Sequence, residues 1–147
     1  MRYTILFSII LFAFLTGCNK DKYGTTPTLK FKSVNTTELR SGQQLVFTLT
    51  FTDAEGDISD SLYVQKYVSY CPGSTADDWY PVPSFPTSNN AKGDLTVNFF
   101  YNGNDPAYQN VAPQCQMNDT AIFRFAIKDK SQHISDTISS PPIVIVY

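Results

Sequence analysis

Histidine is almost missing from this chain of 147 residues, since His133 is the only one. It lies in a turn-like segment, residues 130–133, and a single turn histidine is typical of an exposed surface residue, so no Ser-His-Asp triad is indicated. The sequence also lacks Cys/His clusters with zinc spacing, a glycine-rich phosphate loop and a G-x-S-x-G elbow. These absences predict a protein that is not an enzyme. A small hydrolase that uses two carboxylates stays open as an alternative.

An excess of positive charge is also absent, because 11 Lys and Arg residues stand against 13 Asp and Glu residues, for a formal net charge of -2. Nucleic-acid-binding domains carry a basic patch or stripe, and clustered Lys and Arg residues attract anionic lipid headgroups. The sequence therefore predicts no nucleic-acid partner. Any affinity for a membrane would have to come from a covalent lipid.

The N-terminal apolar run is too short to cross a bilayer as a helix, which takes about 20 residues. Its uncharged core is residues 3–14 (YTILFSIILFAF), which follow Met1 and Arg2. A positive start, a short apolar core and a small-residue exit at Gly17 are the three parts of a secretory signal. The sequence therefore predicts an exported protein with a signal peptide at residues 1–17.

The exit of this signal, residues 15–18 (LTGC), resembles the lipobox of bacterial lipoproteins. The resemblance implies cleavage before Cys18, a thioether-linked diacylglycerol on its sulfur and acylation of its new amino group. Two or more acyl chains hold a protein stably at a membrane. Asn19 stands after Cys18 where Asp would favour the inner membrane, which resembles outer-membrane lipoproteins. The charged residues 20–22 resemble the surface-export signals of Bacteroidota-type lipoproteins, and the membrane face is left open. Residues 18–27 would form a polar tether. The alternative is an ordinary signal peptide with a chance cysteine.

The chain has three cysteines, so lipidation of Cys18 would leave Cys71 and Cys115. An even pair of cysteines in an exported protein suggests a disulfide. Two free or buried thiols are the alternative.

From residue 28 onward, apolar residues recur with a period of two, which is typical of strands with one face on a core. Strands are predicted at residues 28–33, 44–52, 61–70, 94–101, 120–128, 134–138 and 143–147. About seven short strands separated by turn signals predict an all-β, antiparallel sandwich over residues 28–147. Their order and spacing resemble an immunoglobulin-like, fibronectin-III-like or cadherin-like domain.

Two long segments interrupt the predicted strands, residues 71–92 and 102–118, and we expect both to be loops. Loops of this length in a compact domain are usually functional or disordered. They carry Trp79, Tyr80 and Tyr108, and aromatic side chains with a polar tip dominate recognition surfaces. The three residues are therefore candidate contacts for a glycan or a protein. The alternative is that they fill the edge of the core beneath the loops.

Acidic residues gather where the predicted strand 44–52 ends, with Asp53, Glu55 and Asp57 around Gly56. Carboxylates are the hard oxygen ligands that Ca²⁺ prefers, although the spacing is not that of an EF-hand. The D-x-E-G-D pattern resembles strand-end turns of cadherin-like modules, and this resemblance implies Asp129 as a distant fourth ligand. The alternative is a solvated acidic turn whose Asp side chains accept hydrogen bonds from nearby backbone N–H groups.

The sequence therefore predicts a non-catalytic binding or interaction module, held at the cell envelope by lipid on Cys18, with a glycan or a protein as its ligand. A structural or assembly component that meets another envelope protein is the alternative. No cofactor is expected apart from a calcium ion at the acidic turn.

Overall fold

The computed structural model describes residues 23–86, 88–103 and 108–147; the predicted signal peptide and Cys18 lie outside the described residues. The described chain forms the strands β1 (Thr28–Val34), β2 (Glu38–Leu39), β3 (Gln44–Asp53), β4 (Ser61–Tyr67), β5 (Ala76–Pro81), β6 (Ala91–Phe100), β7 (Gln109–Asn110), β8 (Asp119–Lys128), β9 (Ile138–Ser139) and β10 (Ile143–Ile145), and one 3-10 helix, η1 (Pro72–Ser74). None of the helical structure in these ranges has the length and apolar character needed to span a bilayer.

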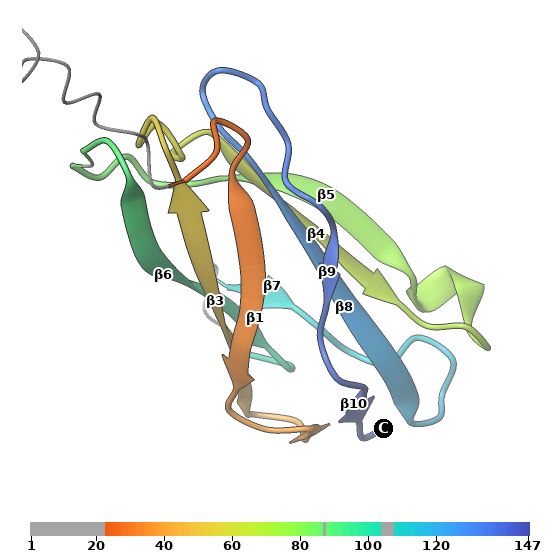
Figure 1. The fold of residues 1–147 in the computed structure, drawn as a ribbon. Helices are drawn as coiled ribbons and strands as arrows, with labels where there is room; N and C mark the ends of the chain where they lie inside the picture. Colours follow the sequence, from red (N-terminus) through yellow and green to blue (C-terminus); the bar gives the residue numbers. More distant parts are fainter. Residues whose placement is uncertain (1–22, 87, 104–107) are drawn as a thin grey trace, which may run out of the picture.

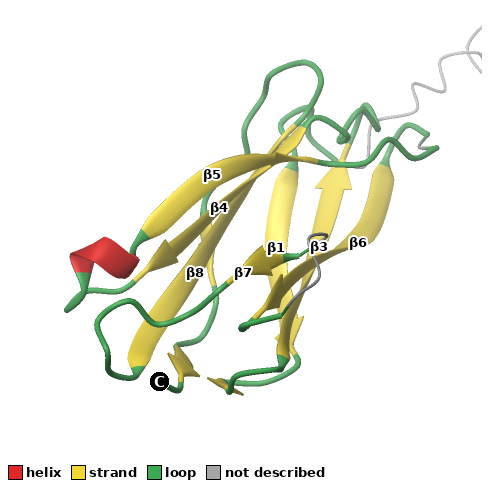
Figure 2. Cartoon of the chain, turned by 180° about the vertical axis from the view of Figure 1, so that it is seen from behind, coloured by secondary structure: helices red, strands yellow, loops and turns green. Residues whose placement is uncertain are grey.

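The strands form two sheets that face each other (Figures 1 and 2). One sheet has the order β1-β3-β6-β7, and the other has the order β2-β10-β8-β4-β5, with β9 also paired to β8. The long pairings are antiparallel, whereas the pairs of β10 with β2 and of β6 with β7 are parallel. The prediction of an all-β, immunoglobulin-like sandwich is confirmed, with the difference that short edge strands make both sheets mixed.

The core lies between the two sheets and is centred on Phe47 of β3. Every second side chain along β3 is buried, as the alternation predicts. The Phe47 ring lies 6.2 Å from that of Phe99 on β6, and 4.9 and 5.2 Å from those of Phe123 and Phe125 on β8. Tilted and edge-to-face aromatic pairs of this kind add to the free energy gained by burying the rings. The aromatic cluster therefore joins the two layers.

The segment 71–92, expected to be a loop, contains a strand. β5 pairs with β4 from Ala76 to Pro81. The sequence hides this strand because Ala and Asp are poor strand formers and proline cannot donate to a ladder. Both features are tolerated here since β5 is the edge of its sheet. Trp79 and Tyr80 are therefore consecutive residues of a strand, and their side chains leave it on opposite faces.

The strand predicted at residues 134–138 does not form as one continuous strand. Ile134 makes an isolated bridge to Lys128, and the short β9 pairs with β8. Serine hydroxyls replace part of the ladder. The Ile127 N–H donates to Ser135 Oγ, and the Phe123 N–H donates to Ser140 Oγ, both at 3.0 Å. Pro141 and Pro142 separate β9 from β10.

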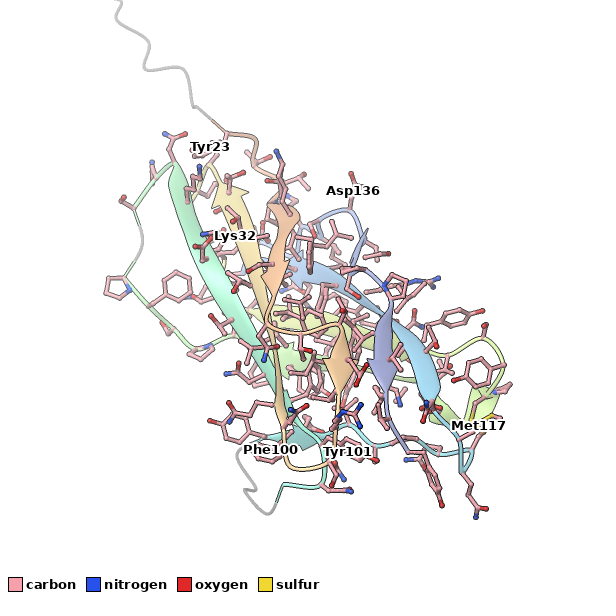
Figure 3. All side chains as sticks on the ribbon, turned by 90° about the horizontal axis from the view of Figure 1, so that it is seen from below. Tyr23, Lys32, Phe100, Tyr101, Met117 and Asp136 are labelled. Carbon is pink, nitrogen blue, oxygen red and sulfur yellow. A yellow bond between two sulfur atoms is a disulfide. The ribbon has the colours of Figure 1, made fainter. Side chains whose placement is uncertain are left out.

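The two ends of the sandwich differ (Figures 1 and 3). The described chain begins at one end, where β3 and β8 also end. Tyr23 and Asp136 lie at this end, which we call the entry end. The C-terminus and Met117 lie at the opposite, far end. The entry end holds the start of the chain by backbone contacts, since the Ala54 N–H donates to Gly24 O at 3.0 Å.

Candidate functional site

The exposed ring of Trp79 lies on the side of β5, β4 and β8 that faces away from the core. Trp79 keeps 39% of its surface exposed. Its ring centroid lies 5.4 Å from that of Tyr63, its cross-strand partner in β4, and the Lys128 ammonium lies 5.3 Å from the Trp79 centroid. The next residue across the sheet is Ala126, a small side chain opposite Tyr63. We call this surface the outer face; it comprises Tyr63, Gln65, Asp77, Trp79, Arg124 and Lys128.

Polar side chains of the outer face lie beside the rings of Trp79 and Tyr63. The Tyr63 hydroxyl donates to Asp77 Oδ2 at 3.2 Å, and Arg124 Nη1 donates to Gln65 Oε1 at 3.1 Å. Burial raises the pKa of Tyr63, and the negative charge and hydrogen bond of Asp77 raise it further. The phenol therefore stays protonated at neutral pH. The outer face combines aromatic surface with donors and acceptors, which is what a polar, ring-shaped ligand requires.

The structure does not bring Trp79, Tyr80 and Tyr108 together. Tyr80 packs toward the core and lines a cleft of about 260 Å³ between the sheets, with Leu62 and Leu95. The Tyr108 ring lies 6.2 Å from Phe100, on the other sheet. The strand predicted at residues 61–70 contains both Tyr63 and Gln65, which lie on one side of a strand because they are two positions apart. Their proximity to Trp79 was missed because β5 was expected to be a loop.

The predicted disulfide between Cys71 and Cys115 is present. The two Cα atoms lie 6.2 Å apart, and the residues have a sequence separation of 44. The alternative of two free thiols is therefore wrong. Cys71 is fully buried in the core, whereas Cys115 belongs to the exposed segment that precedes β8. The bond joins the two long irregular segments at the far end.

A buried polar cluster lies close to this disulfide. Lys66 Nζ donates to Asp119 Oδ2 at 2.9 Å, to Ser74 Oγ at 2.7 Å and to Ala112 O at 3.1 Å. The Ser74 hydroxyl in turn donates to Asp119. All three protons of the ammonium are used, so Lys66 cannot act as a general base for Ser74. The cluster is structural and fastens η1 and β4 to the start of β8.

All four acidic residues singled out in the sequence come together at the entry end. Asp53, Asp57 and Asp129 each offer a carboxylate oxygen within 4.8 Å of the others, and Glu55, Asp129 and His133 form a second such group. Asp53 and Asp129 are fully buried. Asp53 ends β3 and Asp129 follows β8, so the cluster links the two sheets.

Local hydrogen bonds orient these carboxylates. Asp129 uses both oxygens, since Oδ1 accepts from the His133 N–H at 2.8 Å and Oδ2 lies 3.0 Å from His133 Nδ1, whereas Asp53 and Asp57 each use one. Asp53 Oδ2 accepts from the Gly56 N–H at 2.5 Å and the Asp57 N–H at 3.1 Å. Asp57 Oδ2 accepts from the N–H and the hydroxyl of Ser131, at 3.1 and 2.7 Å. The second oxygens, Asp53 Oδ1 and Asp57 Oδ1, are buried and accept no hydrogen bond from the described residues. The backbone contacts expected for an acidic turn are therefore present and still leave two buried oxygens without a partner among the described residues.

Gly56 is required for this geometry. Its φ is +71°, and a Cβ built on it would lie 2.4 Å from Ser88 O, so a larger residue would displace the loop. The pKa of Asp53 is raised, and burial is the largest cause. The negative charges of Asp57 and Asp129 also raise this pKa, whereas the hydrogen bonds from the backbone of Asp57 and Gly56 lower it. The site therefore disfavours ionised Asp53 unless a positive charge compensates.

Comparison with known proteins assigns the chain to no family. No protein-family model and no curated protein matches the chain. Among solved structures, the sporulation control protein Spo0M of Bacillus subtilis is similar over 85% of this chain and 51% of its own, about half its length, with 8% identity and a TM-score of 0.49. A Niemann-Pick type C2 protein from the Japanese carpenter ant is similar over 86% and 97%, with 9% identity and a TM-score of 0.45. A CARDB domain from Pyrococcus furiosus, solved in complex with di-metal ions, covers 85% and 98%, with 9% identity and a TM-score of 0.35.

Proposed function

We propose that this protein is a lipid-anchored binding module of the cell envelope, without catalytic activity, that holds a glycan on its outer face. The observation that carries the proposal is Trp79, an indole that stays 39% exposed on an open sheet. Removing such a ring from water is favourable, so an exposed tryptophan beside ordered polar groups is typical of a contact surface.

The outer face has the chemistry that a sugar needs. Apolar C–H faces of a pyranose can stack on Trp79 and Tyr63, while Asp77, Gln65 and Arg124 can bond its hydroxyls. The cation over the indole does not prevent this, because the Lys128 ammonium also lies 3.3 Å from an Asp60 oxygen. Lys128 therefore keeps a partner when a ligand covers the ring.

Substitution of Trp79 by alanine tests the surface. We expect glycan affinity to fall about fivefold or more, because one stacked ring contributes on the order of 1 kcal/mol. The measurement is a glycan array followed by calorimetry on the best-bound glycan, using the full chain in detergent. Tyr147→Ala is the matched control, since Tyr147 is an exposed aromatic residue at the far end.

Unchanged affinity in the Trp79 variant, or a folded wild-type chain that binds no glycan on the array, would contradict the proposal. Capture of an envelope protein through the outer face, with no glycan bound, would instead support the structural or assembly role.

Substitution of Cys18 by serine tests the anchor. We expect the variant to leave the membrane fraction and to lose incorporation of labelled palmitate, because stable anchoring needs the acyl chains. The measurement is fractionation and labelling in a bacterial host that processes lipoproteins. The double variant Cys71→Ser/Cys115→Ser should keep its label. A Cys18→Ser chain that is still labelled and still in the membrane would rule out this anchor.

A further inference from the structure

We infer that the entry end of the domain is a calcium site formed by Asp53, Asp57 and Asp129. The three residues come from two segments more than seventy positions apart in the sequence, and each directs a carboxylate oxygen to within 4.8 Å of the other two. This inference does not depend on glycan binding, because the site and the outer face share no residue.

The strongest observation is the pair of buried oxygens that accept no hydrogen bond. Asp53 is fully buried, yet its Oδ1 has no hydrogen-bond partner among the described residues, and the same holds for Asp57 Oδ1. A buried carboxylate oxygen without a partner is costly. The other oxygen of each residue is fixed by backbone N–H groups, so the orientation of the free oxygens is determined before any ion arrives.

A cation would also compensate the carboxylates of the cluster. In the part of the chain that the structure describes, no Lys or Arg forms an ion pair with Asp53, Asp57 or Asp129. Lys128, the residue before Asp129, pairs with Asp60 instead. Buried charges in proteins are normally paired or coordinate metals, and a divalent cation would compensate all three carboxylates at once.

The ligand chemistry favours Ca²⁺ over a transition metal. The core of the site offers oxygen only, and Ca²⁺ takes six to eight oxygen ligands from carboxylates, carbonyls and water. The carboxylate of Glu55 is exposed and near Asp129, so it can add an oxygen from the solvent side. The imidazole of His133 lies with Nδ1 3.0 Å from Asp129 Oδ2, where it supports a ligand and need not be one.

The ion would connect parts of the fold that otherwise meet through few bonds. Asp57 O accepts from the Lys130 N–H at 3.0 Å, which joins the loop after β3 to the turn after β8. The same loop holds the start of the described chain, since the Ala54 N–H donates to Gly24 O. Calcium at this position would therefore fix the entry end against both sheets.

Calcium titration of the full chain in detergent tests the inference. After removal of metal by a chelator, we expect calorimetry to show saturable binding with a Kd at or below about 1 mM, the range of extracellular calcium modules. The melting temperature should rise with calcium concentration, because an ion that binds only the folded state stabilises it. Asp57→Asn should weaken binding about tenfold or more, since even groups outside the ligand shell change affinity by this amount. Asp136→Asn is the matched control, an exposed aspartate at the same end.

His133→Ala distinguishes a calcium site from a transition-metal site. The variant should keep its affinity for Ca²⁺ within about threefold of the wild type, whereas a site that depends on the imidazole would lose far more affinity for its metal. The inference is overturned if folded wild-type chain shows neither heat nor a melting shift at about 10 mM Ca²⁺. It is also overturned if Asp57→Asn binds calcium as the wild type does, or if Zn²⁺ binds better than Ca²⁺ and depends on His133.

Discussion

Replacing Lys66 by methionine is expected to lower the free energy of unfolding by about 3–5 kcal/mol, the usual effect of removing one partner of a buried ion pair. Asp119 is fully buried, and the Lys66 side chain is only 11% exposed. One Asp119 oxygen already lacks a hydrogen-bond partner among the described residues, so without the ammonium this carboxylate would keep only the Ser74 hydroxyl. Urea unfolding followed by circular dichroism measures the loss.

Two further variants isolate the cause. Lys32→Met breaks a pair with Asp94 in which both side chains are exposed, and it should change stability by about 1 kcal/mol or less. Lys66→Met/Asp119→Leu removes both charges and should recover part of the loss, because an apolar pair of similar volume replaces the ions. A single Lys66→Met variant as stable as the Lys32→Met control would contradict the expected contribution of the buried pair.

Opening the disulfide is expected to destabilise the domain by about 4 kcal/mol, from the chain entropy of a closed loop of this length. Cys71 and Cys115 have a sequence separation of 44, and the loop between them includes β5, β6 and β7. Reduction frees these strands in the unfolded chain, so the unfolded state gains entropy that the bond had removed. The measurement is urea unfolding with and without a phosphine reductant, which does not cleave a thioether at Cys18.

The double variant Cys71→Ala/Cys115→Ala separates the bond from the environment of its sulfur atoms. Cys71 is buried in the core, so alanine there adds a small cavity to the entropic loss. We therefore expect the variant to be at least as destabilised as the reduced wild type. Equal stability of the oxidised and reduced wild type would contradict the expected contribution.

The period of two was enough to predict the strands that build the core. β3 and β6 alternate strictly, and β8 alternates except at Ala126, which is also buried, because each strand has one face on the core. β5 could not be predicted, since an edge strand needs neither an apolar face nor a full set of donors. The outer face therefore remained hidden, because it depends on the pairing of Trp79 with Tyr63 across β5 and β4.

The two buried polar clusters show the same limit. The acidic turn was visible because Asp53 and Asp57 are close in sequence, and a resemblance supplied Asp129. The contact of Lys66 with Asp119 spans 53 positions, and no local pattern signals it. Lysine has a low propensity for strands, so Lys66 makes β4 harder to predict. In the fold, Lys66 is the centre of a hydrogen-bonded cluster.

The direction of β1 has a mechanical consequence. β1 begins at the entry end and runs antiparallel to β3, with Thr28 opposite Thr52 and Val34 opposite Phe47. If the chain is held at its N-terminal side while a ligand pulls on the outer face, the force acts along these strands. The ladder between β1 and β3 is then sheared, so its hydrogen bonds share the force and would have to break together. A force across the strands would instead peel the same ladder open one bond at a time.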